Sequence, residues 1–157
     1  MLRTELKPGD AIAGKEGQAF AIIGSRRINL FSAKKIKVTA EKEKGEIKTI
    51  GRRTTGNKTK GVKLKVEMTI YEPEDVFDDI MLDYINAGKD LYFDLLIENE
   101  DPTSEAGLKQ MLVTGINLDS ITLAEIDADK DFLEKDVSAT AEGIQRVKKF
   151  NRLSYAD

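Results

Sequence analysis

The sequence predicts a mainly β fold: a β-sandwich or barrel with one flanking α-helix and a long loop between two of its strands. Two observations carry this prediction. Segments in which apolar and polar residues alternate recur along the chain and are bounded by glycine-rich or acidic turns. Only one segment, at about 73–88, repeats its apolar residues with the three- and four-residue spacing of an amphipathic helix. Many short strands with one helix are typical of a sandwich or barrel with a helix appended.

The composition fits one domain over 1–157 and excludes several kinds of chemistry. The chain has 157 residues, with no cysteine and no histidine. Disulfides, thiolate metal sites and histidine-based catalysis are therefore excluded. The 25 Lys and Arg side chains nearly balance the 28 Asp and Glu side chains, so the net charge is −3. We expect a protein that is not an enzyme and that uses no cofactor or metal.

The sequence contains neither a membrane-spanning run nor a signal peptide. No segment approaches 18 consecutive apolar residues, and the polar segment 1–17 lacks the apolar core of a signal peptide. We therefore expect synthesis and folding in a cytoplasm, without membrane anchoring.

The first strands follow from alternation and turn chemistry. Ala19–Ile23 is a short apolar strand, and Gly24 with Ser25 predicts a two-residue hairpin turn into a second strand at 27–31. Segments 33–42 and 62–71 alternate more clearly, and both carry lysine on the polar face.

Segment 44–61, KGEIKTIGRRTTGNKTKG, separates these two alternating strands and is basic and almost free of apolar residues. Long loops of this kind are uncommon in compact domains and are usually functional or disordered. We expect it to be mobile in the free protein and ordered by contact with another protein. Its candidate contact residues are Arg52, Arg53, Asn57, Lys58 and Lys60.

The helix signals lie at both of its ends. Pro73 suits the first turn, acidic residues complement the positive N-terminal end, and Gly88 is placed to cap the C-terminus. The face opposite the apolar stripe is either a solvated face or a docking face for a basic partner. Its acidic residues are Glu74, Asp75, Asp78 and Asp79.

The remainder predicts strands at 91–98 and 109–126, the second with a bend near 115–117, and a weaker strand at 135–147. An acidic turn lies at 127–131. The polar tail 148–157 is expected to be loosely held.

The sequence partly resembles three kinds of binding site, and each lacks a required feature. Segment 51–59 lacks the lysine directly after the second glycine, and the helix, that a phosphate-binding loop requires. The aspartates at 127, 129 and 131 open like a calcium loop, but Phe132 and Ser138 replace the required glycine and glutamate. The basic loop has no aromatic residues for stacking on bases. A soluble β-barrel module that binds nucleic acid through this loop remains the alternative.

Three stretches, GKEGQAF (14–20), VTAEKEK (38–44) and IGRRTTGNKTKG (50–61), carry a family resemblance. Together they resemble the tail tube proteins of contractile-tailed bacteriophages, in particular those of PBSX-type prophages, and of R-type bacteriocins. The resemblance is strong over about residues 12–71 and looser downstream.

This resemblance implies a structural subunit that forms hexameric rings, which stack into a hollow tube inside a contractile sheath. It implies that the long loop reaches the neighbouring ring. Its implied partners are other copies of the chain, the tail sheath protein, and tape-measure and baseplate proteins, with DNA as a passenger in the lumen. The protein would be made in a bacterial cytoplasm and assembled into a virion tail or a released bacteriocin particle.

Overall fold

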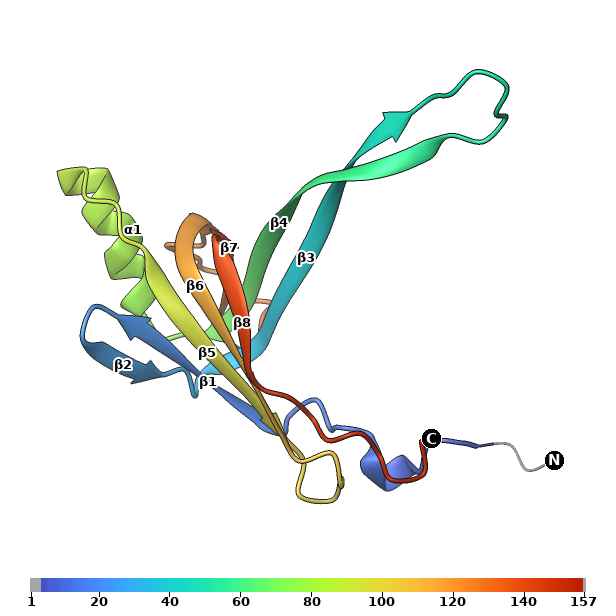
Figure 1. The fold of residues 1–157 in the computed structure, drawn as a ribbon. Helices are drawn as coiled ribbons and strands as arrows, with labels where there is room; N and C mark the ends of the chain where they lie inside the picture. The colour runs from blue at the N-terminus through green and yellow to red at the C-terminus, as the bar shows by residue number, and fades with distance from the viewer. Residues whose placement is uncertain (1–3, 157) are drawn as a thin grey trace. The chain divides into compact units, whose positions relative to one another are not determined.

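The computed structural model describes residues 4–156, whose elements are traced in Figure 1. The mainly β class with one α-helix that the sequence predicts is confirmed over these residues, and the structure shows their strand pairs to be antiparallel. In chain order the elements are the 3-10 helix η1 (Pro8–Asp10), β1 (Gly17–Ile23), β2 (Arg26–Asn29), β3 (Ala33–Ile47), β4 (Gly56–Tyr71), α1 (Val76–Ala87), β5 (Phe93–Glu100), β6 (Leu108–Ile121), β7 (Glu134–Ala141) and β8 (Gly143–Lys148).

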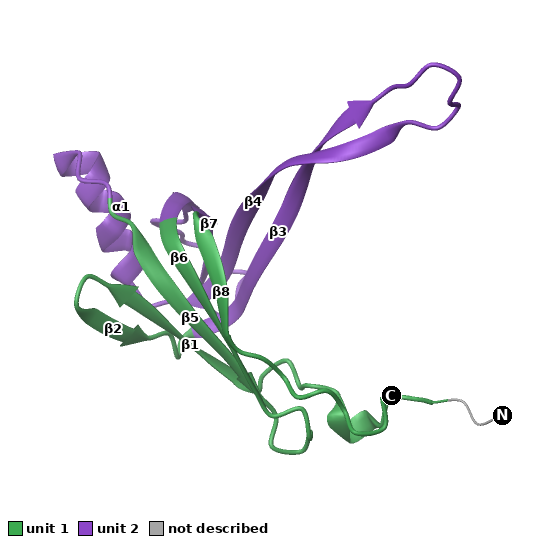
Figure 2. Cartoon of the chain, viewed as in Figure 1, with its two compact units in different colours: residues 1–32, 91–116, 142–157 green, residues 33–90, 117–141 purple. Residues whose placement is uncertain are grey.

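The chain divides into two compact units, coloured separately in Figure 2. The first unit comprises residues up to 32, 91–116 and 142 onward; the second comprises 33–90 and 117–141. Each is discontinuous in sequence, and β6 passes from one to the other after Ile116.

In the first unit the strands are ordered β2-β1-β5-β6-β8, with every pair antiparallel. The predicted turn at Gly24 and Ser25 is confirmed, since Ile23 pairs with Arg26 across it. The core of this unit is built from alternating inward residues of its strands, together with side chains from its loops. Its buried apolar residues are Ala19, Ala21, Leu30, Phe93, Leu95, Ala106, Val113 and Ile116.

The predicted bend in the 109–126 strand is confirmed at Gly115, which has a φ of 65°. The register of β5 against β6 shifts between Phe93 and Leu95, opposite this bend. The Gly115 amide turns out of the ladder and donates a hydrogen bond to Asp94 Oδ1 at 3.2 Å. The bend therefore lies just before the point where β6 passes into the second unit.

The predicted strand at 135–147 is wrong as one element, because it is two strands. β7 pairs with β4 and with the end of β6, whereas β8 pairs with the earlier part of β6. Between them the Glu142 N–H donates to the Thr114 carbonyl at 3.1 Å. The weak alternation could not reveal this change of partner.

The second unit orders its strands β6-β7-β4-β3, and α1 supplies Phe77 and Ile80 to its core. The helix begins at Val76, later than the predicted 73, because Asp75 has a non-helical backbone and Glu74 Oε1 accepts the Val76 N–H at 3.2 Å. The Gly88 cap is confirmed, with a φ of 68°.

The predicted unstructured loop at 44–61 is wrong in extent. β3 continues to Ile47 and β4 begins at Gly56, so only residues 48–55 form a turn. Backbone pairing continues through polar residues whose side chains gave no alternation signal, for example Glu46 opposite Asn57. The segment forms a hairpin.

The tail after β8 is held more firmly than the sequence predicts. The Asn151 N–H donates to the Ala106 carbonyl at 2.7 Å. The Tyr155 hydroxyl donates to Asp10 Oδ2 at 2.7 Å, which joins the tail to the N-terminal segment. These contacts lie in side chains and turns that carry no periodic signal.

Candidate assembly surfaces

The far part of the β3–β4 hairpin is a two-stranded ribbon. The ladder between β4 and β7 begins at Leu64, so residues 41–63, called here the hairpin arm, pair with each other and, within the described residues, with no third strand. Figure 1 shows the arm running out to a rounded turn. Its paired part reaches roughly 20 Å at about 3.3 Å per residue. Both outer backbone edges of the arm are therefore open to pairing with another chain.

The candidate contact residues divide between two places on the arm. Arg52 and Arg53 lie on the tip, residues 48–55, while Asn57, Lys58 and Lys60 lie on β4. All five side chains are exposed. The tip is shaped by a turn in which the Arg52 N–H donates to the Thr49 carbonyl at 3.2 Å, and Arg52 Nε donates to Thr54 Oγ1 at 3.1 Å.

The arm is not uniformly basic. Lys63 Nζ lies 2.8 Å from Glu43 Oε1. The hydrogen bond and the charge of that carboxylate raise the pKa of Lys63 above its ordinary value. Glu41 lies opposite Lys63 in the ladder, and the Lys60 stem lies close to Gly45. On the β3 side of the arm acids alternate with bases, whereas the β4 side carries Lys58, Lys60 and Lys63 and no acid. The acids interrupt the basic surface, and the arm has no aromatic residue to stack on bases, which disfavours the nucleic-acid alternative.

The four acidic residues proposed for the helix face are not equivalent. Asp75 and Asp79 are exposed, and Glu74 is half-buried while accepting the Val76 N–H. Asp78 faces the subunit's own interior: its two carboxylate oxygens each lie 3.0 Å from Lys135 Nζ. The docking face is thus reduced to Asp75 and Asp79, with Glu74 beside them.

Lys135 is the buried charge of the second unit, with a side chain 1% exposed. Glu72 adds a second carboxylate at 3.3 Å. Burial lowers the pKa of Lys135, but the hydrogen bonds and charges of Asp78 and Glu72 outweigh it and hold the pKa above its ordinary value. The sequence alone does not reveal this residue, because nothing local marks a lysine as buried.

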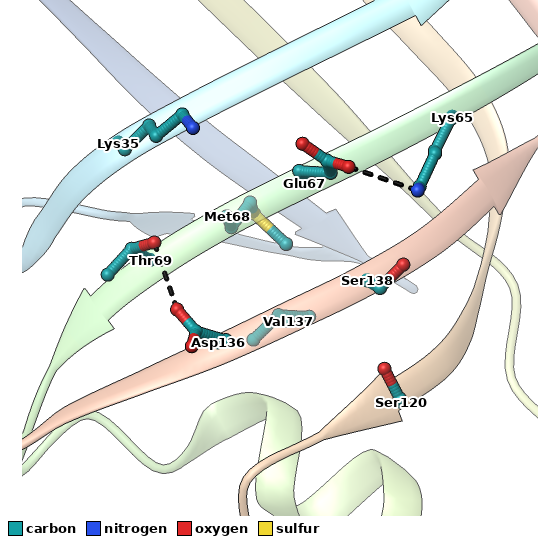
Figure 3. Close-up of a pocket in the computed structure, with 9 residues that line it drawn as sticks. All are labelled: Lys35, Lys65, Glu67, Met68, Thr69, Ser120, Asp136, Val137 and Ser138. Carbon is teal, nitrogen blue, oxygen red and sulfur yellow. Dashed lines mark hydrogen bonds and ion pairs between the residues drawn. The ribbon is translucent and has the colours of Figure 1, made fainter.

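The sequence also does not reveal a concave polar surface, about 330 Å³ in volume, formed by β3, β4, β7 and the end of β6 (Figure 3). Its polar side chains pair with one another: Thr69 Oγ1 donates to Asp136 at 3.1 Å, and Lys65 lies 3.0 Å from Glu67. The hydrogen bond from Lys65 lowers the pKa of Glu67. Ser120 and Ser138 complete the rim. Lys35 on β3 also lines this polar, open surface.

The acidic turn at 127–131 forms a local hydrogen bond, since the Asp129 N–H donates to Asp127 Oδ1 at 3.0 Å. Over residues 4–156 no three acidic side chains come together as a metal site would require. The same residues include no helix with the length and apolarity needed to cross a bilayer.

A comparison with protein families assigns the chain that carries these surfaces to a family. The model of a family described as phage tail tube protein matches residues 4–147. This chain belongs to the phage tail tube protein family. The resemblance noted in the sequence is thereby confirmed, and a tail tube protein is a structural protein, not an enzyme.

Two relatives of this tail tube protein come from Bacillus subtilis (strain 168). The uncharacterized protein YqbM is 35% identical over 137 residues, covering 87% of this chain and 90% of that protein. The phage-like element PBSX protein XkdM is 34% identical over 137 residues, with the same coverage of 87% and 90%.

Solved structures share the fold of this tail tube protein at low sequence identity. A chain of the anti-feeding prophage baseplate has a TM-score of 0.67 at 7% identity, covering 87% of this chain and 95% of that one. The SPP1 tail tube gives 0.63 at 10% identity, with coverage of 87% and 78%. A chain of the PVC sheath–tube complex, from an extracellular contractile injection system, gives 0.59 at 13% identity, with coverage of 83% and 89%. Such identities show the fold alone.

Proposed function

We propose that this tail tube subunit forms hexameric rings that stack head to tail into the hollow inner tube of a contractile tail, in a phage tail or an R-type bacteriocin. The observation that carries the proposal is the hairpin arm, residues 41–63. It extends beyond the last strand that pairs with it and ends in a tip carrying Arg52 and Arg53.

The arm needs a partner for physical reasons. Its two strands leave backbone N–H and C=O groups on both outer edges, and such edges pair readily with another chain. A two-stranded ribbon is also only marginally stable alone in water. A neighbouring ring offers a fixed surface against which Asn57, Lys58 and Lys60 make contacts along β4 while Arg52 and Arg53 make contacts at the tip.

Stacking of rings is a heterologous association, in which two different patches of the same chain meet. The chain offers a basic tip and the acidic Glu74, Asp75 and Asp79 on α1. Because exposed ion pairs contribute only about 0–1 kcal/mol each, the interface must combine many contacts with backbone pairing.

Structures of similar fold support the architecture and the partners. The anti-feeding prophage baseplate was solved with 6-fold symmetry, and the PVC complex joins a tube to a sheath. We propose a ring of six copies here, with the tail sheath protein outside it, tape-measure and baseplate proteins at its ends, and DNA only as a passenger. The subunit would be made in the cytoplasm and assembled into a tail particle.

Electron microscopy of the purified protein across a concentration series tests the proposal. We expect rings and tubes at high concentration, and the chain should be found in induced tail particles. A protein that stays monomeric at every concentration and is absent from such particles contradicts the proposal.

The nucleic-acid alternative has its own test. Titration with single-stranded DNA at two salt concentrations should give weak binding, because the acidic residues of the arm oppose it. Submicromolar binding that weakens steeply with salt would favour the alternative.

A further inference from the structure

The tip of the hairpin arm and the exposed face of α1 match each other in both charge and apolarity. We propose that the tip of one copy docks on α1 of a copy in the adjacent ring, with Ile50 seated on Leu82 and Ile85. This inference rests on the proposed stacking of rings and names the two patches that meet.

The tip presents an apolar side chain between cations. Ile50 is fully exposed, at 103% of its reference area. Arg52 and Arg53 follow it after Gly51, and the Arg52 N–H donates to the Thr49 carbonyl, so the turn holds Ile50 at the end of the arm. An aliphatic side chain held at full exposure is poised for burial against another apolar surface.

The helix presents the complementary pattern. Asp75, Asp79 and Leu82 are four and three residues apart, so they follow one another along a single face. Ile85 lies one turn beyond Leu82. The exposed fractions are 40% for Leu82 and 60% for Ile85.

No positive side chain occurs anywhere in α1, whose sequence is VFDDIMLDYINA. The carbonyls at its C-terminal end add negative partial charge beside Ile85, and Lys89, two residues beyond the helix, offsets part of it. Leu82 and Ile85 therefore form an aliphatic pair in a negative setting. Ile50 is an aliphatic side chain near two arginines, so the two patches are complementary.

The two patches belong to the same unit of the chain but cannot meet within one copy. Figure 2 shows the tip and α1 far apart in the second unit. Docking therefore joins two copies through different patches. Such an interface is heterologous and propagates as an open filament, which is the geometry of a tube.

The aliphatic contact should dominate the ionic one, because exposed ion pairs contribute little while burial of Ile50 removes apolar area from water. The ring then repeats a modest contact around its circumference, so the combined avidity exceeds that of a single arm.

Disulfide trapping tests the contact directly, because the chain has no cysteine of its own. In the doubly substituted chain Ile50→Cys with Leu82→Cys, each copy can be linked to the next. Mild oxidation of assembled tubes should give a ladder of linked subunits on a non-reducing gel. A second pair, Ile50→Cys with Ile85→Cys, detects docking in which the tip lies one helical turn further along α1.

Ile50→Cys with Phe132→Cys is the matched control, because Phe132 is exposed at 76% but lies outside α1, directly after the acidic turn. It should give no ladder. Tubes that assemble normally while neither test pair forms a ladder would overturn the docking and leave the stacking of rings intact. A wild-type protein that forms no tube overturns both.

Charge exchange supplies an independent readout. Asp75→Lys with Asp79→Lys should raise the protein concentration required for tube formation at least tenfold. Adding Arg52→Glu and Arg53→Glu to the same chain should restore much of it. If the fourfold variant assembles no better than the twofold one, the two patches do not meet.

Discussion

Lys135 Nζ lies 3.0 Å from both carboxylate oxygens of Asp78, and this ion pair joins β7 to α1. Glu72, just before the helix, reaches the same ammonium group at 3.3 Å. A lysine with a side chain 1% exposed must be paired, since an unpaired buried charge is costly. The pair therefore sets where α1 lies within the second unit, and with it the acidic face proposed for docking.

Removing one partner of this pair should destabilise the subunit strongly. Asp78→Ala leaves Lys135 buried with Glu72 as its remaining carboxylate, and we expect a loss of about 3 kcal/mol in the free energy of unfolding. Urea unfolding followed by circular dichroism measures it. The double replacement Lys135→Met with Asp78→Leu should recover much of the loss, because no unpaired charge stays buried: Glu72 loses its partner but is 39% exposed to water.

Lys63→Ala is the control, because it removes a pair with Glu43 whose lysine side chain is 78% exposed. Its urea midpoint should stay close to that of the parent protein. Equal losses for Asp78→Ala and Lys63→Ala would contradict a buried, structural role for Lys135.

Gly115→Ala should destabilise the first unit at the bend of β6. The φ of 65° is costly for a residue with a side chain, and an added Cβ would lie 2.8 Å from Glu142 Oε2 and 2.9 Å from its Cβ. We expect a loss of about 2 kcal/mol, measured by urea unfolding. Gly61→Ala is the matched control, since a Cβ there meets nothing within 4 Å and its φ is not positive. A larger loss for Gly61→Ala would refute this account of the bend.

Stability should fall in acid through Asp101. Its carboxylate accepts the N–H of Ala13 at 3.0 Å and that of Thr103 at 2.9 Å, and these hydrogen bonds hold the pKa of Asp101 below its ordinary value. A depressed pKa stabilises the folded state above the unfolded-state value of about 4 and loses that contribution as the pH falls through the lower folded value.

Asp101→Asn removes this titration. Urea midpoints of the parent and of the variant, measured from pH 6 to pH 2, should therefore differ most at pH 6 and converge in acid. A difference that stays constant over this range would show that the charge of Asp101 contributes nothing to stability.

Arg52→Glu with Arg53→Glu should leave a folded subunit that polymerises poorly, because both side chains are exposed on the tip and support no contact of the core. Sedimentation and electron microscopy at matched concentrations measure the effect, and an unchanged circular dichroism spectrum shows that folding is intact. Unchanged polymerisation would mean that these arginines do not carry contacts between rings.

Local signals in the sequence determined a large part of this structure. A short apolar run placed β1, and alternation placed 33–42 of β3 and 62–71 of β4. Turn chemistry placed the β1–β2 hairpin, and Gly115 marked the bend in β6. Helical spacing with Gly88 found α1 and its end. Each of these depends on which face of one segment is apolar, and side-chain order along the chain carries that information directly.

The tertiary structure alone decided which segments pair. The polar ends of β3 and β4 form a ladder because each provides backbone partners for the other, so the expected loop became the hairpin arm. Strand pairing also divided 135–147 between two strands, and the packing of α1 left Tyr84 and Ile85 near its end exposed. It also turned Asp78 inward to Lys135. Periodicity specifies a face, but hydrogen-bonded ladders and buried ion pairs join residues far apart in sequence, and only the folded chain brings them together.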